Sequence, residues 1–375
     1  MGLNLLYLVP GETGGMETYA RRLVPAVAAA RPDLELVAFL NREAHAAFAP
    51  DELGDGVEKV LVETNGRSRP RRILAEQLLL PRRLREHGIG LLHSLGGTTP
   101  ARPGVPTVLT LYDVTYARHP EAHTWAMRSG LRVLVPLAAR SADRIVTISR
   151  ASADDIADVL GVPRARIDVV YPGGLLPGPA TLEPELRHRL ELGDAPIVLS
   201  VSARRRHKNL ARLLRAFAGI TAEPRPLLVL PGYTTEFEDE LVAESDRLGI
   251  RDRVRLLGWV SSADLEGLYA AAACFVFPSL AEGFGLPVLE ALERGVPVAC
   301  SNASSLPEVA GDAARYFDPL DAGDMQRAVE ELLHDRALAA GLADAGRLQA
   351  KRFSWERSAE ELGAVYDRVL GEAEA

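Results

Sequence analysis

Short apolar runs alternate with amphipathic stretches along most of the chain. Runs such as Leu3–Val9, Thr107–Leu111 and Ile197–Val201 are rich in leucine and valine. Apolar runs of this length are typical of strands that are buried on both faces, as in a parallel sheet. A following stretch, 210–217, carries its apolar residues at helical spacing. The alternation predicts an α/β fold whose parallel sheets are covered by helices.

The length of the chain predicts more than one domain. At 375 residues it exceeds the usual size of a single domain and is typical of two. The clearest Pro/Gly-rich stretch is Tyr-Pro-Gly-Gly-Leu-Leu-Pro-Gly-Pro at 171–179, which is typical of a linker. We therefore expect an N-terminal domain over residues 1–176 and a second domain over 177–354.

Composition excludes several classes of protein. The net charge of −8 argues against a broad nucleic-acid surface, because such surfaces are basic. Cys274 and Cys300 lie in or beside apolar runs, which predicts buried core residues and a reducing cytoplasm. Leu3–Val9 is too short to span a membrane and lacks the flanks of a signal peptide. We expect a cytoplasmic protein.

One stretch, residues 278–293, carries the most specific pattern. Cys274–Phe277 predicts a buried strand that Pro278 ends. Gly283 and Gly285 predict a tight turn, and Pro287 suits the first turn of a helix because it has no N–H to lose there. The result is a strand, a turn and a helix, the arrangement that places a binding loop at the edge of an α/β sheet.

Two carboxylates belong to this stretch, Glu282 in the loop and Glu290 in the helix. A helix N-terminus at the carboxyl end of a strand is where anionic and hydroxyl-rich ligands bind. Two carboxylates there suit a polyhydroxylated ligand, since each accepts hydrogen bonds from neighbouring hydroxyls. The alternative is that Glu282 is an ordinary acid at a helix start and Glu290 a solvated residue. The intervening Gly-Phe-Gly-Leu-Pro favours the functional interpretation.

A cationic loop follows the apolar run Ile197–Val201. It contains Arg204, Arg205, Arg206 and Lys208, directly before a helix. Fixed cations and the free N–H groups of a helix start together form an anion site. Positive charge at this end opposes the helix dipole, which indicates an anionic ligand; a solvated basic loop is the alternative.

The segment Glu282-Gly-Phe-Gly-Leu-Pro-Val-Leu-Glu290 resembles the E-x7-E signature of retaining GT-B glycosyltransferases, in particular family four. The resemblance covers almost the whole chain. It implies two Rossmann-like, doubly wound domains that face a central cleft, with the acceptor bound to the first and a nucleotide sugar to the second. It also implies that a final helix, 355–375, crosses back onto the N-terminal domain.

The reaction that the resemblance implies is transfer of a hexosyl or deoxyhexosyl group, with retention, from a nucleotide diphosphate sugar. The acceptor would be a hydroxyl of a glycan, a lipid-linked molecule or a natural product. A non-catalytic sugar-nucleotide-binding protein, and a related epimerase or phosphorylase, are the alternatives. No D-x-D motif is present, so we expect neither a metal ion nor a cofactor beyond the sugar nucleotide.

The resemblance also assigns roles to residues. Glu282 would contact the transferred sugar and Glu290 the ribose. Lys208, in its Lys-Asn-Leu context, would bind the diphosphate together with an arginine, of which Arg204 is our first choice. The other residues assigned to the donor are Gly14 and Gly15 in the first glycine turn, Phe284, Gly285, Leu286 and, through backbone groups, Val260.

Polar residues at strand ends predict the acceptor side of the cleft in the first domain. We place His93 and His119 there, with Asp113 as an orienting residue. Tyr112 stands where the family commonly has histidine. Its hydroxyl forms hydrogen bonds but is no base near neutral pH, because a tyrosine pKa is about 10. In a front-face mechanism the departing phosphate takes the acceptor proton, so activity does not require that histidine.

The segment 67–86 is strongly basic. Arginines at 71, 72, 82, 83 and 85 flank the apolar Ile73–Leu80. A basic amphipathic segment is typical of a surface that lies on an anionic membrane. A core helix with a solvated basic rim, interrupted by Pro81, has the same pattern, and the sequence leaves both interpretations open.

Overall fold

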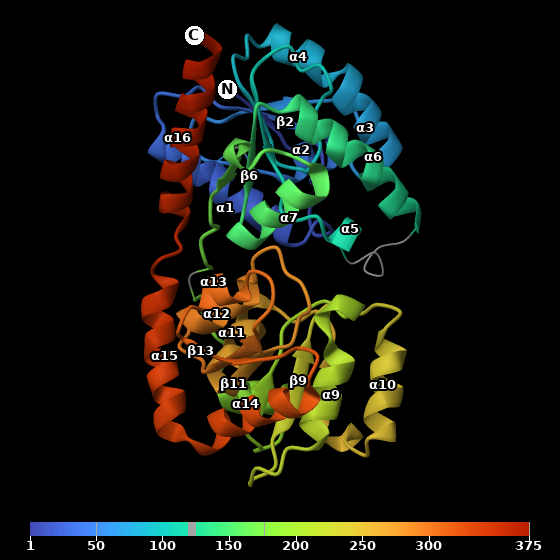
Figure 1. The fold of residues 1–375 in the computed structure, drawn as a ribbon, viewed down its shortest axis with the longest axis vertical. Coiled ribbons are helices and arrows are strands. Elements are labelled where there is room, and N and C mark those ends of the chain that lie inside the picture. Colours follow the sequence, from blue (N-terminus) through green and yellow to red (C-terminus); the bar gives the residue numbers. More distant parts are fainter. Residues whose placement is uncertain (50, 119–124, 176, 375) are drawn as a thin grey trace. The chain divides into compact units, whose positions relative to one another are not determined.

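The computed structural model describes residues 1–49, 51–118, 125–175 and 177–374. These residues form two compact units, each with a parallel sheet flanked by helices (Figure 1). Unit 1 contains Met1–Arg118, the segment that ends at Gly173, and the chain from Phe353 onward, whereas unit 2 runs from Gly174 to Arg352. The predicted pair of Rossmann-like α/β domains is confirmed.

The sheet of unit 1 has the order β3-β2-β1-β4-β5-β6-β7 among the described residues, and every pair of neighbours is parallel. Its strands are β1 Gly2–Asn4, β2 Val37–Leu40, β3 Glu58–Leu61, β4 Leu92–Ser94, β5 Thr107–Thr110, β6 Arg144–Thr147 and β7 Ile167–Val169. The chain order reverses beside β1, which lies between β2 and β4. In such sheets the carboxyl ends of the strands at the reversal form the ligand-binding edge.

Helices cover both faces of this sheet. They are α1 Gly15–Ala30, α2 Arg42–Ala47, α3 Arg69–Leu78, α4 Leu80–Glu86, α5 Thr115–Arg118, α6 Trp125–Ser141, α7 Arg150–Leu160 and α16 Trp355–Glu374. Leu92 of β4 packs in a core cluster with α3 and α4, and Leu109 of β5 in one with α6 and α7. Ser94 is opposite Leu109 in the register, so these four helices share one face of the sheet.

The other face of unit 1 carries the C-terminal helix. His93, between Leu92 and Ser94, points to this face and bonds Tyr366 of α16 (Nδ1 to hydroxyl, 2.8 Å). Its Nε2 lies 2.7 Å from the Thr110 hydroxyl, so both ring nitrogens have partners. Arg31, at the end of α1, forms an ion pair with Asp367 of α16 (2.9 Å). The final helix thus packs against α1 and the sheet of unit 1.

The sheet of unit 2 has the order β10-β9-β8-β11-β12-β13 and is also parallel among its described strands. They are β8 Ile197–Leu199, β9 Leu227–Pro231, β10 Val254–Leu257, β11 Ala272–Phe277, β12 Val298–Ser301 and β13 Ala314–Phe317. The helices are α8 Glu183–Arg189, α9 Leu210–Ala218, α10 Glu238–Arg247, α11 Ser262–Ala271, α12 Leu286–Glu293, α13 Leu306–Ala310, α14 Ala322–His334 and α15 Arg336–Ala350.

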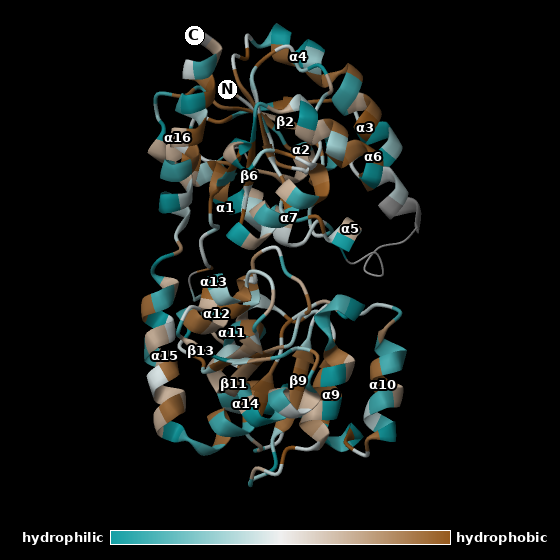
Figure 2. Ribbon diagram, viewed as in Figure 1, coloured by the Kyte–Doolittle hydropathy of each residue, from teal (hydrophilic) through white to brown (hydrophobic). Residues whose placement is uncertain are grey.

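Apolar burial holds each unit together. Figure 2 shows brown, apolar strands inside each unit and helices with one apolar and one polar face. In unit 2, Phe217 of α9 and Met325 of α14 pack on the strand residues Val276 and Phe317, and all four are at most 1% exposed. Cys274 and Cys300 are unpaired and fully buried, so the prediction that they are core residues is confirmed. Within the described ranges no helix is long and apolar enough to cross a membrane.

Unit 2 begins with a close approach between backbone and a carboxylate. A Cβ atom at Gly174 would lie 1.7 Å from Oε1 of Glu293, the last residue of α12, so a larger residue there would displace the carboxylate. Burial raises the pKa of the Glu293 carboxyl to about 7, although the guanidinium of Arg294 lies 3.6 Å away and opposes the shift. Glu290, one turn earlier, also has a pKa raised by burial.

Replacing Tyr366 with phenylalanine tests the packing of α16 on the sheet. The change leaves Nδ1 of the buried His93 without a partner, so we expect the free energy of unfolding of unit 1 to fall by about 1–3 kcal/mol. Urea unfolding followed by tryptophan fluorescence measures the loss. The half-exposed Tyr233 supplies a matched control, Tyr233→Phe. An equal loss of unfolding free energy in both variants would contradict a specific contribution of the buried hydrogen bond.

Replacing Glu293 with glutamine tests its raised pKa. The folded protein keeps the Glu293 proton up to about pH 7, whereas the unfolded chain releases it near the usual value of about 4.3. Between these values the folded state binds more protons, so this residue makes stability fall as pH rises. We expect the urea concentration at the unfolding midpoint of Glu293→Gln, measured relative to wild type, to be higher at pH 8 than at pH 5.

The exposed Glu185→Gln is the control for this measurement. A difference between Glu293→Gln and wild type that is the same at both pH values would contradict the expectation.

Candidate active site

The loops after β8 and β11 meet at the reversal of strand order in unit 2. These two strands are neighbours in the sheet, so their carboxyl ends lie side by side. The Leu280 amide donates to the His207 carbonyl (2.8 Å), and the Asn209 side chain donates to the Pro278 carbonyl (3.0 Å). These bonds hold the cationic loop and the glutamate loop in one fixed arrangement.

Lys208 and Glu282 form an ion pair across the two loops. The Lys208 ammonium donates to Glu282 Oε1 at 2.6 Å, and the two side chains are 16% and 12% exposed. The ammonium also lies 5.5 Å from the centre of the Phe277 ring. A partly buried pair is screened less by water and salt than a surface pair, so its charges act strongly on a nearby ligand. The structure therefore brings together these two predicted site residues.

Two serines that the sequence analysis did not assign to the site hold the Glu282 loop. Ser304 donates to the Glu282 carbonyl (2.7 Å), and Ser305 donates to the carbonyl of Phe284 (2.7 Å). Both follow β12, the next strand in the sheet. The Ser-Ser-Leu-Pro sequence at a strand end was the available signal. Because they bind carbonyls, these serines fix the loop and leave the Glu282 carboxylate to the ion pair.

The turn into α12 follows the predicted pattern. Gly285 has a φ of +108°, in the region that favours glycine, and a Cβ there would lie 2.6 Å from Leu306. Leu286 begins the helix, Pro287 occupies its first turn, and Phe284 is buried (3% exposed). Among these predicted donor residues, Phe284 therefore packs in the core and Gly285 shapes the turn.

Glu290 lies within α12 and is held from one side. Its Oε2 accepts a hydrogen bond from the Tyr269 hydroxyl of α11 (2.9 Å). Burial is the main cause of its raised pKa, which the Tyr269 bond and Arg294 counteract. The carboxyl is thus oriented before any ligand binds, and Tyr269 is a second supporting residue that the sequence analysis missed.

Arg204, the first choice for the diphosphate, has its guanidinium in the interior at 1% exposure. It donates to Glu238 (2.6 Å), to Thr234 (3.0 Å) and to the carbonyls of Leu230 and Leu257, which lie in the last two residues of β9 and β10. Through these bonds the Arg204 guanidinium connects β9 to β10. Its position favours a structural role over contact with a ligand.

The two neighbouring arginines differ from Arg204. Arg206 is exposed and forms an ion pair with Glu240 (2.5 Å), and its guanidinium lies 4.5 Å from the Phe237 ring centre. Arg205 is exposed and, in the part of the chain that the structure describes, forms no ion pair. Arg205 is therefore the arginine of the loop whose charge is free to meet an anion.

Aromatic side chains stand beside Val260, the residue assigned to the nucleotide base. Trp259 is 73% exposed and Tyr233 is 44% exposed, and their ring centres are 4.6 Å apart. They follow β10 and β9, the two strand ends that Arg204 joins. Val260 itself is half-buried. The predicted base loop therefore has an aromatic pair beside Val260.

In unit 1, the glycine turn lies at the N-terminus of α1. Gly14 has a φ of +64° and directly precedes the helix. A Cβ atom added to Gly14 or to Gly15 would meet no atom of the described residues within 4 Å. The N–H groups of a helix start attract anions. The turn therefore has room for a ligand close to its backbone.

Tyr112 and Asp113 follow β5, also in unit 1. The Tyr112 hydroxyl is buried, its ring packs edge-on against Tyr19 (5.2 Å between centres), and burial raises its pKa far above the usual value. Asp113 is exposed and accepts a hydrogen bond from the Thr115 amide (2.8 Å) at the start of α5. Tyr112 therefore stays protonated, and Asp113 fixes the local turn.

The two histidines placed on the acceptor side have different outcomes. His93 is 0% exposed and has partners on both ring nitrogens, and burial lowers its pKa to about 3. A neutral, enclosed imidazole of this kind supports the fold and does not reach a ligand at the surface. His119 lies outside the described residues.

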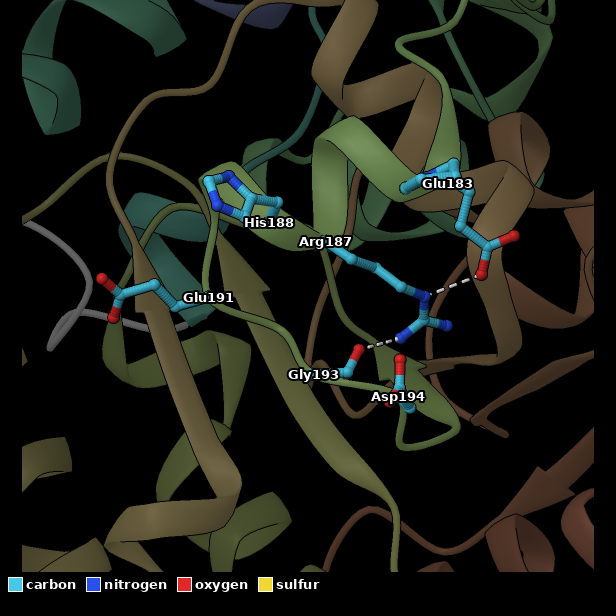
Figure 3. A pocket seen from close by; sticks show the side chains of 7 residues that line it. Glu183, Arg187, His188, Glu191, Gly193 and Asp194 are labelled. Carbon is cyan, nitrogen blue, oxygen red and sulfur yellow. Dashed lines mark hydrogen bonds and ion pairs between the residues drawn. The ribbon is translucent and has the colours of Figure 1, made fainter.

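A surface hollow of about 770 Å³ in unit 2 is separate from these residues. Figure 3 shows Arg187 within it, bonded to Glu183 (2.7 Å) and to the Gly193 carbonyl (2.8 Å). The hollow lies before β8, at the end of the strand opposite Lys208. None of the predicted site residues that the structure describes lines it.

Each of the two units matches a known family of proteins. Residues 13–173 match Glycosyltransferase Family 4, and residues 183–349 match Glycosyl transferases group 1. The O-antigen chain mannosyltransferase B of Escherichia coli is 33% identical over 361 residues, which are 91% of this chain and 93% of that protein.

Two further proteins are similar over much of the chain. The MMP alpha-(1->4)-mannosyltransferase of Mycolicibacterium hassiacum is 31% identical over 294 residues, covering 73% of this chain and 68% of that protein. The structure of sucrose-phosphate synthase from Thermosynechococcus elongatus superposes with a TM-score of 0.78 at 21% identity and covers 99% of both chains, which shows a shared fold.

The E-x7-E segment, the two parallel sheets and the near full-length relative lead to one conclusion. The chain belongs to family four of the GT-B glycosyltransferases.

Proposed function

We propose that the protein transfers a mannosyl group from a nucleoside diphosphate mannose to a hydroxyl of a glycan or lipid-linked glycan. Two relatives named as mannosyltransferases, 33% and 31% identical, support the choice of sugar. The observation that carries the proposal is the Lys208–Glu282 ion pair at 2.6 Å, beside the helix that bears Glu290. It supplies a cation for the diphosphate and a carboxylate for sugar hydroxyls.

Charge stabilisation is the main task of the site in this proposal. As the sugar leaves, negative charge grows on the diphosphate, and a fixed cation in a water-poor site stabilises that charge. Lys208 is held in place by Glu282 and is ready to bind the phosphate. Arg205 is the second cation, because the guanidinium of Arg204 is occupied by Glu238 and three other acceptors.

We propose transfer with retention by attack on the front face. The bond between the anomeric carbon and the diphosphate oxygen breaks, and the acceptor oxygen forms a bond to that carbon from the same side. The acceptor proton passes to the departing phosphate oxygen, so no side chain has to act as base. The raised pKa of Tyr112, caused by burial, agrees with a mechanism in which this residue keeps its proton.

Each carboxylate has a positioning role. Glu282 accepts hydrogen bonds from hydroxyls of the transferred sugar, and Glu290, already oriented by Tyr269, accepts them from the ribose. Holding the sugar at two points lowers the entropic cost of reaching the reactive geometry. The cationic side chains take the place of a divalent ion, so we propose that the reaction needs none.

A thermal-shift panel of mannose, glucose and rhamnose nucleotides tests the donor. A ligand that binds only the folded state stabilises it by about 2.7 kcal/mol at one hundred times its Kd. We expect one mannose nucleotide to raise Tm, and Lys208→Met and Glu290→Ala to reduce the shift strongly. The exposed Glu185→Ala should leave it unchanged.

No shift with any sugar nucleotide would leave the fold intact and remove the transferase proposal. A shift with another sugar alone would replace mannose as the donor.

Product analysis tests the reaction. With an α-linked donor and a mannose-terminated oligosaccharide, NMR of the product should show an α linkage, and EDTA should leave the rate unchanged. A β linkage would exclude retention, and a rate that falls with EDTA and returns with a divalent ion would exclude metal independence. Altered sugar nucleotide or free sugar phosphate without glycan product would indicate an epimerase or phosphorylase, and binding without turnover a non-catalytic protein.

A further inference from the structure

Helices α3 and α4 expose large apolar side chains on the surface of unit 1. Leu74, Leu78 and Leu79 are 59%, 63% and 41% exposed. Leu74 and Leu78 are four residues apart on α3, so they lie on one stripe of the helix. Isolated exposed leucines are ordinary, but a contiguous group of them marks an interaction surface.

The inner side of the same helices is occupied by the core. Ala75 of α3 and Leu80 and Leu84 of α4 pack in a buried cluster with strand residues of unit 1. The exposed leucines are therefore not needed for folding of this helix pair. A core helix with a solvated basic rim, one interpretation of the sequence, accounts for the inner residues and the arginines but leaves the outer leucines unexplained.

Arginines surround the exposed leucines. Residues 67–86 contain seven arginines and two glutamates, in a chain whose net charge is −8. Arg71, three residues before Leu74, is exposed, and Arg82, four residues after Leu78, is 74% exposed. Glu86 pairs with Arg82 (2.7 Å) and Arg83 (2.9 Å), so one carboxylate offsets only part of this charge. The surface therefore combines exposed apolar side chains with an excess of positive charge.

A hollow of about 310 Å³ lies along this stripe. Leu74, Leu78 and Leu79 line it, together with Thr64, Asn65 and the ion pair of Arg42 with Glu63 (2.6 Å). Arg71 also lines it. A hollow that joins leucine side chains to the cationic Arg71 suits a molecule with a hydrocarbon part and a phosphate.

The basic segment begins beside the predicted binding edge of unit 1. Arg67, in the loop after β3, forms an ion pair with Glu12 of the glycine turn (2.7 Å). The same face of the sheet carries α6, whose Val133 and Leu137 are 59% and 47% exposed and are accompanied by the exposed Arg140. The same face of the sheet therefore carries exposed apolar side chains near arginines on α3, α4 and α6.

We propose that the outer face of α3 and α4 docks on an anionic membrane surface. Leu74, Leu78 and Leu79 enter the interface between head groups and acyl chains, while the arginines keep their guanidinium groups at the lipid phosphates. The contact is peripheral in this arrangement. Docking brings the binding edge of unit 1 to the membrane, where a lipid-linked acceptor lies. The proposal does not depend on which sugar is transferred.

Vesicle co-sedimentation of the full chain tests this proposal. We expect no binding to phosphatidylcholine vesicles and clear binding when about a third of the lipid is phosphatidylglycerol, with binding lost as salt is raised. Arg71→Gln/Arg82→Gln should weaken binding about fivefold for each arginine. Leu74→Ser/Leu78→Ser should weaken it at least as much at every salt concentration at which wild type binds.

Leu348→Ser, in unit 2, is the matched control, because Leu348 is 66% exposed. The thermal shift with a sugar nucleotide shows that each variant is folded, and it separates loss of docking from failure of the proposed donor. Equal binding to neutral and anionic vesicles, binding unchanged in both double variants, or an equal loss in Leu348→Ser would overturn the proposal. A dimer in sedimentation that dissociates in Leu74→Ser/Leu78→Ser, without vesicle binding, would assign the surface to a second copy instead.

Discussion

The Lys208–Glu282 ion pair depends on how two parallel strands are placed. Its members are far apart in sequence, and they meet because β8 and β11 are neighbours at the reversal of strand order. Hydrogen bonds from the Leu280 amide and the Asn209 side chain then fix the two loops before any ligand arrives. Since a charge that is already fixed does not have to reorganise during reaction, this arrangement favours electrostatic stabilisation of a leaving diphosphate.

Buried polar side chains give each unit its rigidity. Arg204 joins the ends of β9 and β10 in unit 2, and His93 joins the sheet to α16 in unit 1. Each has its hydrogen bonds largely satisfied, as burial requires, and each has a pKa lowered by burial. An arginine and a histidine, residue types that are common in active sites, therefore have structural positions in this fold.

Docking through the surface of α3 and α4 would place the proposed reaction at the membrane. A soluble donor reaches its site by diffusion, whereas a lipid-linked acceptor is confined to a membrane. An enzyme that rests on that surface meets the acceptor at a high local concentration. Because the rest of the chain is acidic, the excess of arginine in this one segment orients this face toward an anionic surface.

The sequence by itself determined the α/β class, the turn into α12 and the pairing of Glu282 with Glu290 on one loop and helix, because these follow from local periodicity and from Gly and Pro conformations. It did not separate Arg204 from Arg205, nor show that His93 is enclosed. Both are decided by which strand ends and helices converge around a side chain. Tyr269 likewise entered the site only through the tertiary structure, because a hydrogen bond between distant segments leaves no local pattern, and the strand-end position of Ser304 and Ser305 did not by itself show which carbonyls they bind.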